Sequence, residues 1–407
     1  MILLLFLLGF VFAHALTLEQ ALEVSTKNNI NVRLSLIDLQ KAEEQIRRAR
    51  AGILPQVSFS YSFTRFDESL AFGFTPKNRH SFLLEVDQTV FNYAVFEGLK
   101  LAKTQKELQE LVYQDVLKEV EFRTKELFYA LLYKKELMRI GEENLAFWEE
   151  NYRTVEGKFQ AGVLPKVELM RAKAQLESAK AQLELLMSDY KKSLEDFRSF
   201  LTLREEIEPK GSLQEQRLKE EAYEELLEKN NSTLKVATKT LDVLEMSVKV
   251  QEGQYYPSLE LFATYQGSTS RRNPTGGTEL IDGYTVGARL SYKLFDGFAR
   301  EASIAQARLD LQRQRENLKQ LRVQLYAELQ KTLLDIRYIS SQLKALELSL
   351  QSAKESLRLS TERYRFGIAT QLEVLDARNN YNNVLQNYYL TLLNHNIAFA
   401  KLERLTR

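Results

Sequence analysis

The longest regular pattern in the sequence is a run of about 69 residues without glycine or proline, at positions 298–366. One unbroken helix of that length would extend about 100 Å, at about 1.5 Å per residue. In its second half, side chains recur every seven positions with a companion row offset by three or four, which predicts a left-handed coiled coil. The first row is Leu329, Ile336, Leu343, Leu350, Leu357 and Tyr364, and the companion row is Leu325, Thr332, Ile339, Leu346, Ala353 and Ser360. By itself this segment indicates a coiled-coil scaffold.

Four shorter segments alternate between apolar and polar residues, which is typical of β-strands. We predict strands at about 56–66, 81–91, 258–267 and 283–295. Most are about nine to eleven residues long, the length at which a tilted strand crosses a bilayer. Each strand has an apolar or aromatic face and a polar face, as a membrane barrel requires. A soluble sandwich strand alternates in the same way, so only the four strands together favour the barrel.

The second half of the chain repeats the first after 202–205 residues. The turn Lys158-Phe159-Gln160-Ala161-Gly162-Val163 matches Arg363-Tyr364-Arg365-Phe366-Gly367-Ile368, for example. We therefore predict a first repeat at 16–211 and a second at 212–407, each reading helix, strand, strand, very long helix and helix. The first helix is expected at 18–50, and the long and following helices at about 94–160 and 165–208, then 298–366 and 370–405.

Four strands cannot close a membrane barrel, because the smallest known barrels need about eight. An open strand edge in lipid leaves unpaired backbone groups, so several chains must pool their strands. A dimer gives eight strands and a trimer gives twelve, and only the trimer leaves a useful lumen. The predicted fold is thus mainly α-helical with a small β part.

The N-terminus resembles an export signal. Residues 2–13 are nearly all apolar and lead into Ala13-His14-Ala15, a small-x-small cleavage pattern. This predicts a signal peptide at 1–15. No Lys or Arg precedes the apolar run, so a retained membrane anchor is the alternative, although the run is short for a spanning helix. No transmembrane helix is predicted in the mature chain.

Composition and charge exclude several other classes of protein. The net charge is +1 with acids and bases interspersed, which gives no reason to expect a nucleic-acid partner. The chain has no cysteine, so it forms no disulfide and has no thiol for a lipid anchor. Its three histidines, His14, His80 and His395, are scattered, and no phosphate loop, metal-ligand spacing or nucleophile motif is present. We predict no enzymatic activity, catalytic residue, cofactor or metal.

Taken together, the tandem repeat resembles the TolC family of outer-membrane channel proteins over essentially the whole mature chain. The resemblance depends on the order, spacing and duplication of several short motifs. They are Leu16-Thr17-Leu18-Glu19-Gln20-Ala21, the Asn-Asn pairs at 28–29 and 230–231, Gln88-Thr89-Val90-Phe91-Asn92, Leu294-Phe295-Asp296-Gly297, Tyr364-Arg365-Phe366-Gly367 and Glu373-Val374-Leu375-Asp376-Ala377.

This resemblance implies a homotrimer with a twelve-stranded barrel in the outer membrane, in contact with its lipid, and a twelve-helix barrel in the periplasm. Such a channel is a passive exit duct. It receives substrates from an inner-membrane exporter through a periplasmic adaptor, the membrane fusion protein. The nearest alternative is a type I protein-secretion channel of the same fold. A remote alternative is a secreted coiled-coil structural protein.

The resemblance also assigns an acidic ring at the periplasmic aperture of the tunnel to Glu373 and Asp376. Both residues have a simpler interpretation. Thr370-Gln371-Leu372-Glu373 is a capping-box pattern, and acids are favoured in the first turn of any helix. Asp376 could equally be a solvated acid. Three copies, however, would place about six carboxylates at one constriction, which would attract cations.

The gate contacts that the family implies fall on Tyr364 and its acidic partner Glu168. Tyr364 is also the last position of the heptad row, so packing alone would explain it. A basic residue that assists the closed state in the family is replaced by Ala369, so the tip either closes by packing and a Tyr364–Glu168 hydrogen bond alone or is less tightly shut. The expected adaptor-docking tips are Gly162, Val163, Gly367 and Ile368, where glycine is needed in any case to end a helix.

Overall fold

The computed structural model describes residues 14–271, 274 and 276–407, so the predicted signal peptide lies outside the described residues except at its last two positions. The chain forms two compact units. The sheet unit comprises Ser35–Tyr113 and Thr233–Leu321. The tip unit comprises the chain up to Leu34, Gln114–Ser232 and Arg322–Arg407. The two long helices contribute to both units. None of the described helices is long and apolar enough to cross a membrane.

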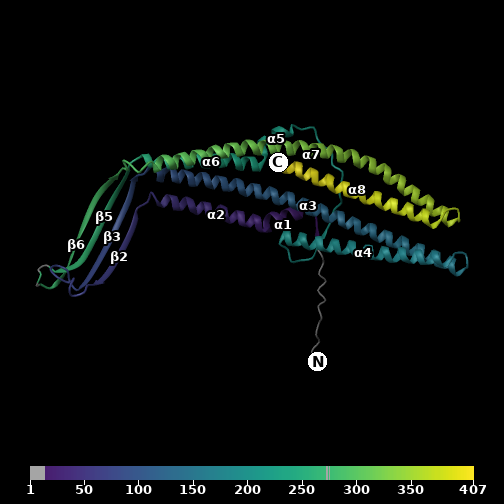
Figure 1. Ribbon diagram of the computed structural model, residues 1–407, viewed down its shortest axis with the longest axis horizontal. Coiled ribbons are helices and arrows are strands. Elements are labelled where there is room, and N and C mark those ends of the chain that lie inside the picture. The colour runs from purple at the N-terminus through teal and green to yellow at the C-terminus, as the bar shows by residue number, and fades with distance from the viewer. Residues whose placement is uncertain (1–13, 272–273, 275) are drawn as a thin grey trace, which may run out of the picture. The chain divides into compact units, whose positions relative to one another are not determined.

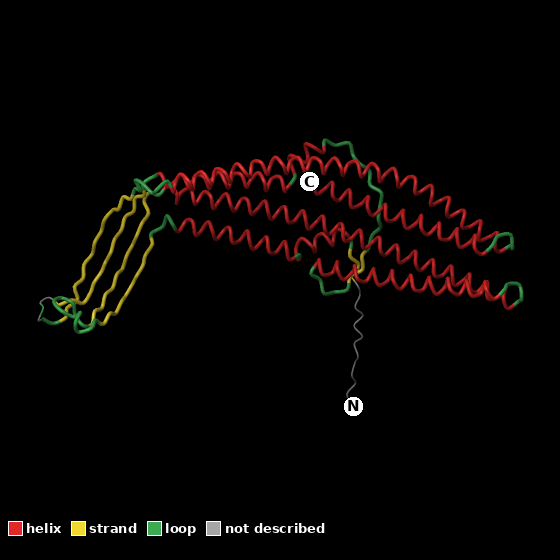
Figure 2. Tube along the Cα trace, viewed as in Figure 1, coloured by secondary structure: helices red, strands yellow, loops and turns green. Residues whose placement is uncertain are grey.

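The sheet unit is built around one antiparallel sheet with the strand order β2-β3-β5-β6 (Figure 2). The strands are β2 (Gln56–Arg65), β3 (Asn78–Phe91), β5 (Ser258–Arg271) and β6 (Thr278–Ser291). This unit also contains most of α2 (Ile30–Ala51) and α6 (Ser232–Glu252). Helix α6 leads into the short 3-10 turn η1 (Gly253–Tyr255). Strands from the two sequence repeats therefore pair, since β3 of the first repeat lies beside β5 of the second.

The sheet has one apolar face and one polar face. The strand register pairs Val57 with Val86, Val86 with Ala263, and Ala263 with Val286, and the rows on either side are apolar or aromatic except for Gln88. We call this the outward face. Its side chains are exposed in the single chain, to 68% for Phe59 and 71% for Val286. The opposite, inward face carries Ser58, Ser60, Ser62 and their neighbours across the strands, which are mainly polar.

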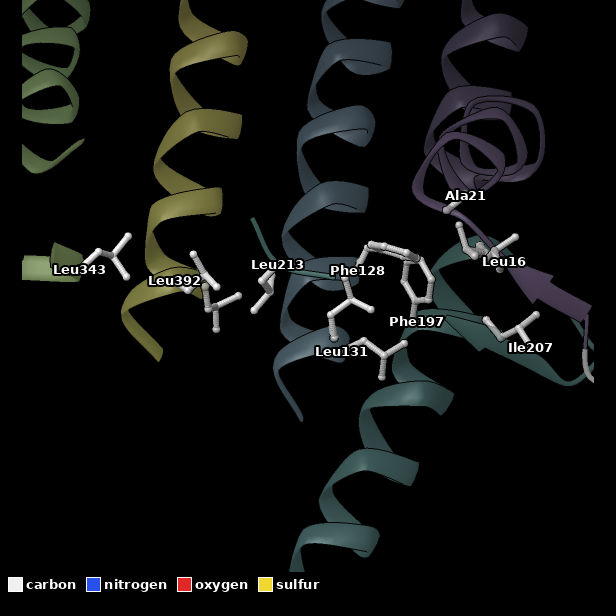
Figure 3. Packing of buried hydrophobic residues seen from close by; sticks show 12 residues of the cluster. Leu16, Ala21, Phe128, Leu131, Phe197, Ile207, Leu213, Leu343 and Leu392 are labelled. Atoms are coloured by element: carbon white, nitrogen blue, oxygen red, sulfur yellow. The ribbon is translucent and has the colours of Figure 1, made fainter. Parts of the chain in front are cut away.

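The tip unit holds the principal hydrophobic core (Figure 3). Phe128 and Phe197, both 2% exposed or less, meet edge to face at 6.1 Å between ring centroids. They pack with Leu343 and Leu392 from the second repeat. The elements of this unit are β1 (His14–Leu16), α1 (Leu18–Asn28), α4 (Lys166–Leu201), β4 (Ile207–Pro209), α5 (Tyr223–Asn230), α8 (Gln371–Thr406) and the larger parts of α3 (Tyr93–Gln160) and α7 (Ala299–Arg365).

The two long helices are uninterrupted, as the sequence predicts (Figure 1). In α7, the heptad rows form the buried side within the tip unit: Leu329, Thr332, Ile336 and Leu343 are at most 2% exposed. In α3, Gly141 allows α4 to approach closely, because a Cβ at that position would lie 2.8 Å from Leu186 Cδ1. Glycine is therefore tolerated inside this helix for a packing reason.

The first helix differs from the expectation of one element at 18–50. It breaks at Asn29, whose extended backbone separates α1 from α2. The Asn29 side chain donates to Phe200 O at 2.9 Å and accepts from Asn31 N at 2.9 Å, so it replaces helical hydrogen bonds with its own. The second repeat breaks in the same way at Asn231, which donates to Leu405 O at 3.1 Å. The Asn-Asn pairs thus join each helix break to the end of a later helix.

Several element ends also differ from the expected positions. The helix predicted to reach residue 208 ends at Leu201, where Thr202 adopts a left-handed conformation (φ 58°), and β4 then pairs in parallel with β1. The hairpin strands are longer at the loop end, since β5 continues to Arg271 and β6 begins at Thr278. The β5 extension is polar, and the β6 extension places Leu280 and Ile281 side by side, so neither shows the apolar alternation of a strand. The strand expected to reach residue 295 ends at Ser291.

Candidate functional site

The two helical hairpins of the tip unit end in turns of the same conformation (Figure 1). Gly162 and Gly367 both have φ +74°, the left-handed conformation that favours glycine after a helix. Val163 N donates to Lys158 O at 2.9 Å, and Ile368 N donates to Arg363 O at 2.8 Å. Both turns expose an apolar side chain, to 69% for Val163 and 68% for Ile368. The repeat therefore produces two equivalent tips with apolar surface.

Glu373 caps the N-terminus of α8 together with Thr370. Its carboxylate oxygen Oε1 accepts from Thr370 N at 3.0 Å and from Thr370 Oγ1 at 3.1 Å, while Glu373 N donates to Thr370 Oγ1 at 3.3 Å. The capping box predicted from the sequence is confirmed. These hydrogen bonds, the backbone one first, hold the pKa of Glu373 below its ordinary value. The carboxylate is therefore both a cap and an exposed negative charge.

Asp376 lies one helical turn beyond Glu373 and is also exposed. Residues three apart lie on neighbouring positions of a helix surface, so the two carboxylates share one side of the first turns of α8. Asp376 makes no hydrogen bond or ion pair with the described part of the chain. Its carboxylate is thus available to solvent and ions, whereas that of Glu373 is partly used in the cap.

Tyr364 and Glu168 come near each other but are not hydrogen-bonded within the described residues. Burial raises the pKa of the Tyr364 hydroxyl, and the negative charge of Glu168 raises it further. Oε1 of Glu168 instead accepts from Arg171 at 2.9 Å, and its buried Oε2 has no partner among the described residues. The Lys158 ammonium lies 4.7 Å from the centroid of the Tyr364 ring. The predicted hydrogen bond is replaced, within one chain, by a cation–π contact from α3 to α7.

A row of buried polar contacts joins α8 to α3 behind the tips. Gln371 Nε2 donates to Asn151 Oδ1 at 3.1 Å, and Arg378 Nε donates to Asn144 Oδ1 at 3.1 Å. Arg378 also lies 4.7 Å from the Phe147 ring. It is only 7% exposed, and burial lowers its pKa. At the outer edge, Arg365 pairs with Glu150 at 3.3 Å.

This polar row was not predicted from the sequence. A signal was available, because Gln371, Arg378, Leu385 and Leu392 recur every seven residues and all four are buried. A heptad count along α8 would have placed Gln371 and Arg378 on the buried side. It would not have identified their partners, which lie more than 200 residues earlier. The described residues contain no group of His, Asp or Glu side chains arranged to hold a metal ion.

An internally repeated chain with a two-faced sheet and paired helical hairpins defines a class of outer-membrane channel proteins. A family model described as outer membrane efflux protein matches residues 21–202 and 223–406. The chain belongs to this family. It is therefore an outer-membrane efflux channel of the TolC type, without enzymatic activity, whose helical part lies in the periplasm.

Individual relatives are distant but match along most of their length. The chain is 22% identical over 392 residues to the proteases secretion protein PrtF of Dickeya chrysanthemi, covering 91% of this chain and 84% of that protein. It is 22% identical over 413 residues to the outer membrane protein TolC of Escherichia coli strain K12, covering 96% and 83%. The crystal structure of the CmeC outer membrane channel of Campylobacter jejuni is similar in fold, with a TM-score of 0.80 and 19% identity over 96% of this chain and 85% of that one.

Proposed function

We propose that three copies of this chain form the exit duct of a tripartite efflux system. The observation that carries the proposal is the exposed apolar face of the sheet. Within the described sheet, β2 and β6 each have one edge without a neighbouring strand. Pairing β6 of one copy with β2 of the next satisfies both edges, and three copies close a barrel of twelve strands. The outward face then meets lipid, and the inward face lines a polar lumen.

The helices of three copies supply the periplasmic tunnel in this proposal. The hairpins α3–α4 and α7–α8 of the three copies give twelve helices in all, and part of their polar surface faces water inside the tunnel. Residues 16–211 and 212–407 act as the two structural repeats, and residues 1–15 direct export and are removed. The exposed tips at Gly162, Val163, Gly367 and Ile368 are apolar surfaces on which a periplasmic adaptor can dock, and the adaptor connects the duct to an inner-membrane exporter.

The first turns of α8 form the aperture of the tunnel. Glu373 and Asp376 from three copies supply six carboxylates to one narrow ring, and the exposure of both side chains supports this role. A ring of fixed negative charge concentrates cations and favours their passage or binding. Tyr364 and Glu168 contribute to closing the tip, together with the contacts of α8 with α3.

A second candidate function, protein secretion, is favoured by the name of one relative, the proteases secretion protein PrtF. Deleting the gene for this chain in its own host distinguishes efflux from protein secretion. Loss of efflux is expected to raise intracellular accumulation of a fluorescent efflux substrate, with complementation by the wild-type chain. Loss of secretion would instead remove a protein from the culture medium. If the deletion changes neither quantity, the duct proposal is wrong.

The contribution of Tyr364 to closure is expected to come from its ring. Because the hydroxyl makes no hydrogen bond with the described residues, Tyr364→Phe should leave the closed-state leak within about twofold of wild type. Tyr364→Ala removes the packing and the contact with Lys158, a cation–π interaction of about 0.5–1 kcal/mol at an exposed site. Ion conductance of the closed channel in planar bilayers measures this leak. A strong increase for Tyr364→Phe would show that the hydroxyl bonds across the gate.

A further inference from the structure

The outward face of the sheet ends in two arginines on the side away from the helices. Arg65 is the last residue of β2 and pairs with Asn78. Since side chains alternate along a strand, it shares the outward face with Tyr61 and Phe63. Arg271 is the last residue of β5 and pairs with Thr278, on the same face as Tyr265. At the opposite end of this face the strands carry Val57, Phe91, Leu259 and Leu290, and no basic residue.

Neither guanidinium is neutralised by the described residues. The structure gives the side chains of Arg65 and Arg271 no ion pair there, whereas Lys77 in the adjacent loop pairs with Glu68 at 2.6 Å. The Arg271 backbone N–H donates to Phe74 O at 3.0 Å, which fixes the end of β5 against the β2–β3 loop. The Arg65 side chain is exposed and that of Arg271 is half-buried, and both lack a counterion among the described residues, so an external anion can pair with them.

On the same face, closer to the helices, lie polar-tipped aromatic side chains: Tyr61, four residues before Arg65, and Tyr265, six residues before Arg271. Tyr61 OH is hydrogen-bonded to His80 Nδ1 at 2.7 Å, and Tyr265 OH donates to Asp282. On the outward face of membrane barrels, aromatic residues of this kind lie at the boundary between acyl chains and headgroups. Arg65 and Arg271 lie farther from the apolar band than these rings do. The two arginines are therefore at the level of the headgroups.

We propose that Arg65 and Arg271 bind the phosphates of anionic glycolipid headgroups in the outer leaflet of the membrane. This inference rests on the proposed function, which places the helices in the periplasm and the arginine end of the sheet at the cell surface. A guanidinium presents a planar fork of donors that matches a phosphate in two parallel hydrogen bonds. The two arginines anchor the barrel to the phosphorylated leaflet and set its depth.

The test uses fluorescent lipid A and the full-length protein in a neutral detergent, with binding followed by fluorescence anisotropy. Replacing Arg65 and Arg271 by glutamine is expected to weaken binding by about fivefold per arginine, or about twenty-five-fold for the double variant. Arg79→Gln is the matched control, because Arg79 neighbours Asn78 in β3 but lies on the inward face, where it pairs with Thr64. It should bind like wild type. Lipid A without phosphates should bind weakly to all variants.

Equal binding of lipid A by the wild type and the double variant would overturn the inference. A loss of binding in Arg79→Gln as large as that in the arginine variants would also overturn it, because binding would then depend only on the total charge. Preference for phosphatidylglycerol vesicles over lipid A would also contradict it, because the surface would then recognise any anionic lipid. Channel conductance is measured on the same samples. If wild type and variants conduct but the arginines do not matter, this inference alone fails. If none conducts, the proposed function fails.

Discussion

Replacing Glu373 and Asp376 together by alanine is expected to abolish block of the channel by multivalent cations. The proposed aperture holds six carboxylates, and removing them leaves no fixed negative charge in the first two turns of α8. Block is measured as the loss of single-channel current on addition of a trivalent cation to the periplasmic side. Because its hydrogen bonds with Thr370 lower the pKa of Glu373, this carboxylate stays ionised as the pH falls from 7 to 5. Block of the Asp376→Ala channel by the trivalent cation should therefore persist over that pH range.

The control for this experiment separates charge from capping. Thr370→Ala removes the cap of α8, at a cost of about 1 kcal/mol, and keeps both carboxylates. Cation block should survive in Thr370→Ala. The cap itself stabilises the fold above the ordinary pKa of glutamate and is lost as the pH falls through the lowered value, since protonation removes the acceptor. Undiminished block in the double alanine variant would show that the constriction lies elsewhere.

Placing an arginine on the outward face of β6 is expected to be far more damaging than placing it one residue away. Val286 belongs to the apolar row with Ala263, while Thr285 pairs with Thr264 on the inward face. An arginine in the lipid-facing band of a barrel costs about 2–4 kcal/mol at the membrane midplane. Val286→Arg should therefore destabilise the inserted protein by that amount, and Thr285→Arg should change its stability by less than about 1 kcal/mol.

Urea extraction of the protein from phospholipid vesicles, followed as the fraction that still sediments with the vesicles, compares the two variants. Recovery of each variant in the outer-membrane fraction is the cellular counterpart. If both arginines are tolerated equally, the alternation of the strand does not distinguish lipid from lumen, and the assignment of the outward face is wrong. If both are equally damaging, the sheet is packed on two sides.

The sequence predicted the strands and long helices because each has a period that persists over its whole length. The residues of β2 alternate without exception between 57 and 64, and α7 repeats its heptad rows from Leu325 onward. The fold class and the repeat are confirmed on these elements. The strand extensions at 268–271 and 278–282 were missed, because hydrogen bonding to a neighbouring strand, and not apolar burial, holds them.

The breaks at Asn29 and Asn231 could not be located for a related reason. Each asparagine lies within a helical pattern of residues. The helix breaks there because the asparagine side chain donates to a backbone carbonyl, that of Phe200 or Leu405, about 170 residues later. The pairing of β1 with β4 likewise involves three residues at each end of a long separation, which is too short for a periodic signal.

At the site, local chemistry was predictable and contacts between hairpins were not. Thr370 and Glu373 are three residues apart, so their capping box follows from spacing alone. The left-handed glycines at the tips follow from the need to end a helix. The partner of Tyr364, by contrast, was expected to be Glu168 and is Lys158 within the chain. That outcome depends on how two hairpins pack, which no local pattern determines.

The proposed duct exists only if three chains assemble in the membrane. The measurement is the protein mass of the complex extracted from the outer-membrane fraction with detergent, obtained by light scattering on a size-exclusion column. We expect about three chains of 47.2 kDa or slightly less, in a complex that separates into single chains only on heating. A single chain recovered without detergent from the periplasm or the medium would contradict the account.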